Sequence, residues 1–133
     1  MKKIAVIDDD INMRKLIRTA IENYDKNISI ITFKDSLELL SILSENYFDL
    51  LIIDYMMPAI DGLELIMHYS NIYKKAPIIL VTAYPDVDNV GVLNENRDIL
   101  NLSIVTKPFD MNELVNTVKK MLNNKSASGC EIL

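Results

Sequence analysis

Polar side chains that can bind a cation or a phosphoryl group stand directly after four separate apolar stretches of the chain. Carboxylates follow the first and third apolar stretches (Asp8, Asp9 and Asp54), a hydroxyl follows the fourth (Thr82), and an ammonium group follows the fifth (Lys107). Any one of these residues alone could simply cap a helix or turn the chain. Their recurrence after four stretches favours a shared site instead.

The charges of these residues indicate which ligand such a site would take. Two carboxylates about 4 Å apart repel each other by roughly 4 kcal/mol at an effective dielectric constant near 20, so a cluster of Asp8, Asp9 and Asp54 requires a cation. Carboxylate oxygens and water suit Mg²⁺, whose coordination is often completed by phosphate oxygens. The ammonium group of Lys107 and the hydroxyl of Thr82 would then complete a site for a tetrahedral phosphoryl dianion.

One carboxylate of this set could attack phosphorus and form an aspartyl phosphate. Asp54 is the candidate, because it stands alone after its apolar stretch, whereas Asp8 and Asp9 come as a pair, as expected of metal ligands. Phosphoryl transfer depends mostly on positioning and charge neutralisation, so a small site suffices when the donor is already activated.

The apolar stretches that carry these residues have the pattern of buried parallel strands. They are rich in β-branched residues and begin 22 to 28 residues apart, at Ile4, Ile28, Leu50, Ile78 and Leu102. Most are apolar throughout rather than alternating, which is typical of strands covered on both faces. Helical patterns lie between them, so the sequence predicts a doubly wound α/β fold, with ligands at the carboxyl ends of a parallel sheet.

Helices are predicted from periodicity and from acidic residues at their starts. The clearest amphipathic patterns run from Met13 to Tyr24 and from Met111 to Leu122. An Asp precedes a Glu by three residues at three expected helix starts, Asp35/Glu38, Asp61/Glu64 and Asp110/Glu113. A fourth helix over 86–97 contains Gly91 and several Asn residues, so we expect it to be the least rigid.

Composition predicts one domain and excludes several classes of function. The chain has 133 residues, of which 50% are hydrophobic, and its net charge of −5 disfavours direct nucleic-acid binding. Its three glycines lie too far apart for a Gly-rich phosphate loop, and no apolar run is long enough for a membrane span. A single cysteine, Cys130, fits a reducing, cytoplasmic setting. We expect the domain to cover 1–123 and a flexible tail or linker start to cover 124–133.

Four motifs in this order and spacing resemble the receiver domain of two-component response regulators, particularly the stand-alone chemotaxis and sporulation regulators. They are Ile4–Asp10, Asp54–Gly62 (D-x-x-M-P-x-x-D-G), Val81-Thr82-Ala83 and Lys107-Pro108-Phe109. The resemblance runs from about Lys2 to Asn123. It implies a flavodoxin-like (βα)5 fold with strand order 2-1-3-4-5.

The resemblance also implies roles for individual residues. Asp54 would accept the phosphoryl group, Asp9 would bind Mg²⁺ directly, Asp8 would bind it largely through water, and the carbonyl of Met56 would be a further ligand. Thr82 would move towards the phosphoryl oxygen.

Lys107 would pair with the phosphoryl group and would precede a cis peptide bond to Pro108. The donor would be a histidine kinase or a histidine phosphotransfer protein, and the phosphorylated domain would change its affinity for a downstream protein. The domain would thereby catalyse its own phosphorylation and dephosphorylation.

Three positions depart from the family pattern or remain open. Ile104 stands where the family often has an aromatic residue that swings inward, so we expect the signal to travel by other packing changes, including a reordering of the fourth helix. Met56 and Tyr84 flank the expected path of the attacking water, where their bulk would either slow dephosphorylation or only shield a loop. His68, the single histidine, is expected to be a partly exposed helix residue.

Alternative functions are a receiver cut from a larger regulator with a DNA-binding or enzymatic output domain, and a docking module that works without phosphorylation. A small phosphatase with an Asp nucleophile would need a second acid two residues after Asp54, where Met56 stands.

Overall fold

The computed structural model describes residues 1–55, 62–83, 95, 96 and 98–132, with side chains described as far as Asn123. The elements, in chain order, are β1 (Lys3–Ile7), α1 (Ile11–Tyr24), β2 (Ser29–Phe33), α2 (Ser36–Leu40), the short 3-10 helix η1 (Leu43–Glu45), β3 (Leu50–Asp54), α3 (Gly62–Ile72), β4 (Pro77–Thr82), β5 (Asn101–Thr106) and α5 (Met111–Ile132). All five expected strands are present, and the observed β2 begins one residue later than the sequence predicted.

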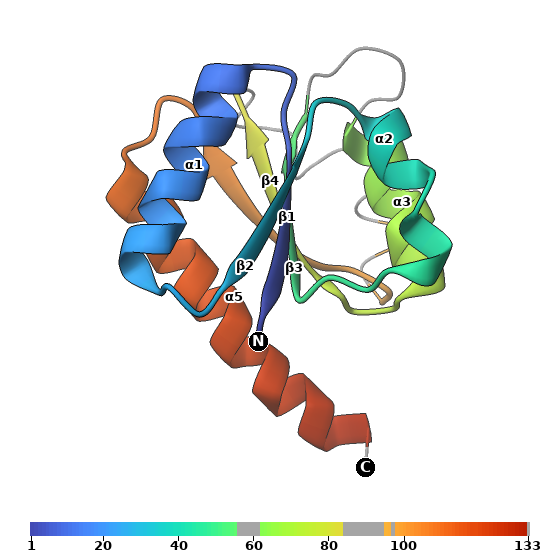
Figure 1. Ribbon diagram of the computed structural model, residues 1–133. Helices are drawn as coiled ribbons and strands as arrows, with labels where there is room; N and C mark the ends of the chain where they lie inside the picture. The colour runs from blue at the N-terminus through green and yellow to red at the C-terminus, as the bar shows by residue number, and fades with distance from the viewer. Residues whose placement is uncertain (56–61, 84–94, 97, 133) are drawn as a thin grey trace.

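The strands form one parallel sheet in the order β2-β1-β3-β4-β5. The predicted strand order and the doubly wound fold are therefore confirmed. Figure 1 shows α1 and α5 on one face of the sheet and α2 and α3 on the other. Every residue of β3 and β4 is buried, which explains why their sequences are apolar throughout instead of alternating.

Two apolar cores flank the sheet, and alternate residues of each central strand enter opposite cores. Leu51 and Ile53 of β3 pack in the core under α2 and α3, whereas Leu50 and Ile52 pack in the core under α1 and α5. The register of β3 is fixed in this way, because a shift by one residue would exchange the two sets. Asp54, the last residue of β3, is therefore held in a fixed position at the carboxyl end of the sheet.

The buried face of α1 is narrower than its apolar pattern suggests. Ile17 and Ile21 are buried, but Leu16 is 54% exposed and Tyr24 is 42% exposed. Successive helix residues are about 100° apart, so Leu16 points to one side when Ile17 faces the sheet. The amphipathic pattern predicted from Met13 to Tyr24 was therefore too wide, because it included Leu16 and Tyr24 among the apolar residues of the packed face.

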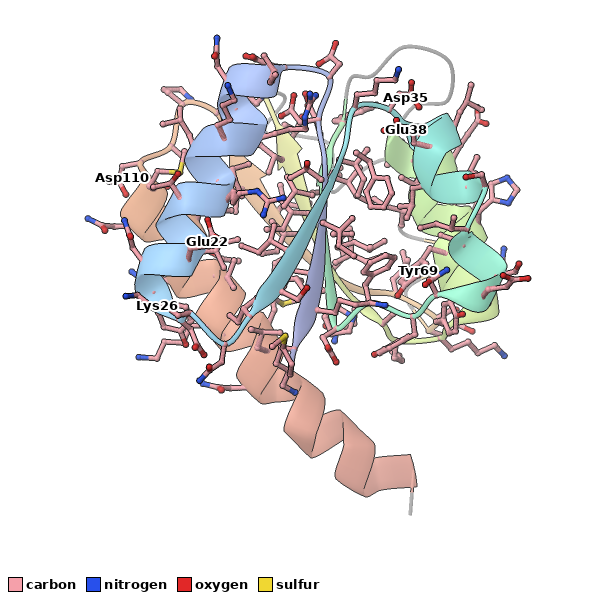
Figure 2. All side chains as sticks on the ribbon, viewed as in Figure 1. Glu22, Lys26, Asp35, Glu38, Tyr69 and Asp110 are labelled. Atoms are coloured by element: carbon pink, nitrogen blue, oxygen red, sulfur yellow. The ribbon has the colours of Figure 1, made fainter. Side chains whose placement is uncertain are left out.

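Helix starts agree with the acidic signals where the structure describes them. The carboxylates of Asp35 and Asp110 accept the backbone N–H of Glu38 at 2.9 Å and of Glu113 at 2.8 Å. Asp35 and Glu38 lie together at the start of α2 in Figure 2. Asp61 lies outside the described residues, as does most of the predicted fourth helix over 86–97.

The carboxyl-terminal segment is helical in the structure. The sequence predicted a flexible tail from Asn124, but α5 continues to Ile132 and extends away from the sheet in Figure 1. No proline interrupts this segment, so its backbone can continue the helix even though Asn124, Ser126, Ser128 and Gly129 are poor helix formers. The division of the chain into a domain over 1–123 and a following segment stays a prediction. None of the described helices combines the length and apolar character needed to cross a membrane.

Candidate functional site

The carboxyl edge of the sheet brings together the residues that the sequence placed after separate strands. Asp54 of β3 pairs with Val81 of β4, and Thr82 of β4 pairs with Thr106 of β5. Asp8 and Lys107 follow the strand ends directly. Parallel strands thus bring all four residues to the carboxyl end of the sheet, as their positions in the sequence predicted.

Three carboxylates cluster at this rim. Oxygen atoms of Asp8, Asp9 and Asp54 all lie within 4.8 Å of one another. Asp8 and Asp54 are buried, with only 4% and 8% of their surfaces exposed, whereas Asp9 is exposed. The cluster therefore concentrates negative charge where two of its three residues are largely shielded from water.

The pKa of Asp8 reports the electrostatic cost of this arrangement. Burial raises the pKa of Asp8 to about 6, and the negative charges of Asp54 and Asp9 add to this rise. The backbone N–H of Asp10 and the ammonium group of Lys107 act in the opposite direction. A cation bound among the carboxylates would relieve the repulsion.

Asp8 is fixed at three atoms by its neighbours. Its backbone N–H donates to the carbonyl of Phe33 at 3.1 Å, and its Oδ1 accepts the N–H of Asp10 at 2.9 Å. Its carbonyl accepts a hydrogen bond from Nη1 of Arg14 at 2.7 Å. Asp10 in turn caps α1 by accepting the N–H of Asn12. The loop that carries the paired acids is therefore tied to both β2 and α1.

Arg14 is a residue that the sequence pattern did not single out. Its side chain reaches back from the first turns of α1 to the carbonyl of Asp8, six residues earlier in the chain. The available signal was a basic residue close after an acidic run at a helix start. That signal is weak, because a solvated surface Arg has the same appearance in a sequence.

Lys107, the first residue after β5, reaches the acidic cluster. Its Nζ lies 3.5 Å from Oδ2 of Asp54, and about a third of its side chain is exposed. Its backbone N–H donates to the carbonyl of Thr82 at 2.7 Å, which ties the loop after β5 to the end of β4. The Lys107–Pro108 peptide bond is cis, as predicted.

Gly62 lets α3 approach the phosphoacceptor candidate closely. A Cβ at this position would lie 2.8 Å from the carbonyl oxygen of Asp54 and 3.0 Å from the Cα of Tyr55. The N–H of Gly62 donates to the carbonyl of Tyr55, whose own N–H donates to the carbonyl of Val81. The motif contained this glycine, but only the structure shows that backbone contact requires it.

The remaining predicted positions divide between described and undescribed residues. Thr82 is buried at the end of β4, one residue beyond Val81, which pairs with Asp54 of β3. Ile104 is partly buried and packs against the core under α2 and α3. His68 is exposed on α3, in line with its expected place. Met56 and Tyr84 lie outside the described residues, so the ligand role of Met56 stays a prediction.

The donor set fits a hard divalent cation. Carboxylate oxygens are the ligands that Mg²⁺ takes in proteins, and three carboxylates from two strand ends can hold it with water completing the coordination. Thiolate or imidazole ligands are absent from this cluster. The acidic triad is thus typical of a magnesium site.

Comparison with known proteins agrees with the fold. A family model described as "Response regulator receiver domain" matches residues 4–119. Sporulation initiation phosphotransferase F of Bacillus subtilis is 30% identical over 129 residues, covering 94% of this chain and 97% of that protein. The response regulator receiver protein CpdR of Brucella abortus is 31% identical over 123 residues, covering 92% and 98%.

Solved structures give the same result. TrrA of Thermotoga maritima, a response regulator solved in complex with Mg²⁺-BeF, is 33% identical with a TM-score of 0.75, covering 91% of this chain and 99% of that chain. A receiver domain protein of Clostridium thermocellum is 25% identical with a TM-score of 0.79, covering 96% and 98%.

Proposed function

The chain belongs to the response regulator receiver domain family of two-component signalling, with an acidic pocket of Asp8, Asp9 and Asp54 for phosphorylation, and we propose that Asp54 accepts the phosphoryl group. The observation that carries this assignment is the meeting of three carboxylates with the ammonium group of Lys107 at one rim of the sheet. Asp54 alone among the three carboxylates pairs with Lys107 at 3.5 Å, so the acceptor stands between the cation site and a fixed positive charge.

The metal part of the proposal assigns Mg²⁺ to the acidic cluster. Asp8, Asp9 and Asp54 would hold the ion, with the Met56 carbonyl as a further predicted ligand. When bound, Mg²⁺ neutralises charge on the phosphoryl oxygens. The relative TrrA was solved with Mg²⁺-BeF, which supports this choice of ion.

The chain's own residues have distinct tasks in the transfer. A carboxylate oxygen of Asp54 forms a bond to phosphorus while the phosphorus–nitrogen bond of a phosphohistidine donor breaks, and the electron pair stays on the imidazole nitrogen. Lys107 exchanges its contact with Asp54 for one with a phosphoryl oxygen. The hydroxyl of Thr82 hydrogen-bonds another phosphoryl oxygen. Attack by water on the aspartyl phosphate later restores the carboxylate.

The family implies a histidine kinase or phosphotransfer partner as donor, and we propose that the phosphorylated form changes its affinity for a downstream protein. Ile104 has no hydroxyl with which to follow a moving Thr82. The signal would therefore pass through repacking of the core that Ile104 contacts and of the segment over 86–97.

Intact-mass spectrometry with acetyl phosphate and Mg²⁺ tests the assignment. One phosphoryl group should appear on the wild-type protein and none on Asp54→Asn. Removing Mg²⁺ with a chelator should abolish the modification. Asp25→Asn is a matched control, because Asn can also accept the N–H of Asn27 and Asp25 lies between α1 and β2, at the amino end of the parallel strands.

Phosphorylation of Asp54→Asn at the wild-type rate would overturn the assignment. A wild-type protein that stays unmodified with active donors would instead favour a docking module that works without phosphorylation. The response regulator ArlR of Staphylococcus saprophyticus is matched over only 54% of its own length, so a receiver that forms part of a longer regulator is a second candidate arrangement for this chain.

A further inference from the structure

Tyr55 lies next to Thr82 at the carboxyl end of the sheet. The register pairs Asp54 of β3 with Val81 of β4, so Tyr55 and Thr82 are the next residues along the two strands. The backbone agrees, because the N–H of Tyr55 donates to the carbonyl of Val81 at 2.9 Å. A movement of the Thr82 side chain therefore takes place beside Tyr55.

Alternation along the strands places the side chains of Thr82 and Asp54 on opposite faces of the sheet. Thr82 stands two residues after Leu80, which packs in the core under α2 and α3. Asp54 stands two residues after Ile52, which packs in the core under α1 and α5. The hydroxyl of Thr82 must therefore turn over the end of β4 to bond a phosphoryl oxygen on Asp54, and this movement withdraws it from the face that α2 and α3 cover.

The withdrawal of Thr82 leaves space that a neighbouring side chain must fill. Thr82 is buried, and packed protein interiors tolerate few voids. Ile104 pairs with Leu80, two residues before Thr82, and its β-branched side chain has little freedom at χ1. Tyr55 stands beside Thr82 itself and is only partly buried, so its ring can move inward from the exposed side.

Tyr55 is also joined to α3. Its carbonyl accepts the N–H of Gly62 at 3.0 Å, and its Cα lies 3.0 Å from where a Cβ of that glycine would stand. Its side chain packs against the same core as Leu63 and Met67, in the first half of α3. The second half of α3 is held by the hydroxyl of Tyr69, which bonds the backbone just before β3. A displacement of Tyr55 is therefore passed to the first half of α3.

We propose that Tyr55 is a positioning residue that couples phosphorylation of Asp54 to α3, because its ring moves into the space that Thr82 leaves. The inference rests on the proposed function of Asp54 and names the residue through which the core under α2 and α3 repacks. Phosphorylation then changes the surface of α3 around Met67.

The test uses Mg²⁺-BeF, with which TrrA was solved, in place of the phosphoryl group. Fluorine-19 NMR of the bound fluoride shows that a protein is folded and that its site is occupied. The methyl resonances of Met67 and of Met121, which lies in the core under α1 and α5, are followed by carbon-13 labelling in the same samples.

Three variants are compared at full occupancy. Tyr55→Leu removes the ring, and Tyr55→Phe keeps it. Tyr24→Leu is the matched control, because Tyr24 ends α1 on the other face of the sheet and is 42% exposed.

In the wild type, we expect the methyl group of Met67 to shift more than that of Met121. Tyr55→Leu should reduce the shift of Met67 by roughly 3-fold or more, whereas Tyr55→Phe and Tyr24→Leu should retain it. The inference is overturned if Met67 does not shift in the occupied wild type, if Tyr55→Leu leaves the shift unchanged, or if Tyr55→Phe loses as much as Tyr55→Leu. Absence of bound fluoride in the wild type would instead contradict the proposed function, so the two failures are distinguishable.

A second measurement follows the ring of Tyr55 in the wild-type protein. Its carbon-13 ring resonance is assigned from its loss in Tyr55→Phe, and its exposure is measured by the broadening that a soluble paramagnetic agent causes. Mg²⁺-BeF should reduce this broadening at Tyr55 and leave it unchanged at Tyr24. Equal broadening of the Tyr55 resonance in the free and occupied proteins would show that the ring does not move inward, and would also overturn the inference.

Discussion

The two ends of β3 are held to the same helix, α3, in opposite ways. Before the amino end of the strand, the hydroxyl of Tyr69 donates to the carbonyl of Phe48 at 3.1 Å and accepts its N–H at 2.9 Å. At the carboxyl end, Gly62 places bare backbone against the carbonyl of Asp54. One end is therefore closed by paired polar groups, and the other leaves a carboxylate among like charges.

The amino end is built for stability. Tyr69 and Phe48 are fully buried, and Tyr69 also contacts the ring of Tyr73 with centroids 5.0 Å apart. Figure 2 shows Tyr69 on the sheet side of α3. Burial raises the pKa of the Tyr69 hydroxyl far above its ordinary value, which only reinforces the neutral form that these hydrogen bonds use.

The carboxyl end uses burial differently. The pKa of Asp8, beside Asp54, rises to about 6, so at neutral pH the carboxylate is charged in a place that disfavours the charge. The same physical effect is harmless at Tyr69 and costly at Asp8. The comparison teaches that this fold concentrates instability at the rim where a cation and a phosphoryl group would bind.

The largest expected effect is at the amino end. Tyr69→Phe leaves the buried N–H and carbonyl of Phe48 without their partner, which should lower the free energy of unfolding by about 3 to 4 kcal/mol. Urea denaturation followed by circular dichroism measures the change.

Tyr73→Phe is the control for this prediction. Its hydroxyl makes only longer contacts, at 3.3 and 3.4 Å, to the carbonyls of Leu43 and Ser44. The loss should be less than about 1 kcal/mol. Equal losses in both variants would break the contrast between the ends of β3.

The sequence predicted the residues at the carboxyl end of β3 better than the hydrogen bonds between Tyr69 and Phe48 before its amino end. Strand ends follow from runs of apolar residues, so the positions of Asp54 and Thr82 directly after such runs are enough to assign both to one edge of the sheet. Tyr69 and Phe48 are 21 residues apart, and nothing in their local patterns indicates that one hydrogen-bonds the other. Long-range side-chain to backbone contacts of this kind depend on packing that periodicity does not encode.

The details of the site were also beyond the sequence. The reach of Arg14 to the carbonyl of Asp8 depends on the angle at which α1 leaves the sheet. The exposure of Leu16 depends on how narrow the face is that α1 packs against the sheet. Periodicity assigns faces to helices, but tertiary packing decides how wide those faces are.

The second prediction concerns the pH dependence of stability without Mg²⁺. The folded state raises the pKa of Asp8 from 3.8 to about 6, so it binds more protons than the unfolded state between these values, and this contribution to stability is lost as pH rises through that window. The shift corresponds to roughly 2 to 3 kcal/mol. Asp8→Asn should remove this contribution and be more stable than the wild type at pH 7.

Chemical denaturation of both proteins from pH 4 to pH 7 measures the difference, which should shrink towards pH 4. Adding Mg²⁺ at pH 7 should stabilise the wild type more than Asp8→Asn. If Asp8→Asn were less stable than the metal-free wild type at pH 7, the idea of a destabilised rim would be refuted.

The third prediction tests the contact between α3 and the carboxyl end of β3. In Gly62→Ala, the added Cβ meets backbone atoms of Asp54 and Tyr55, which cannot move aside as a flexible side chain would. We expect a loss of about 1 to 2 kcal/mol in unfolding free energy. Phosphorylation by acetyl phosphate should slow as well, because relief of this backbone clash would displace Asp54.

Ser70→Ala, on the same helix, is the control. The hydroxyl of Ser70 is buried and has no hydrogen-bond partner among the described residues, so its removal should leave stability equal or slightly higher. A Gly62→Ala protein with normal stability and normal phosphorylation would show that the close approach is not required.

The smallest expected effect is at Arg14. Arg14→Met keeps the length of the aliphatic chain but removes the donor to the carbonyl of Asp8, so the unfolding free energy should fall by about 1 kcal/mol. Calorimetry should also detect weaker Mg²⁺ binding, because the backbone of the paired acids loses one of its ties. Arg18→Met is the control on the same helix. A variant that loses stability but binds Mg²⁺ as tightly as the wild type would limit Arg14 to a structural role, whereas tighter binding would mean that its charge repels the ion more than its hydrogen bond organises the site.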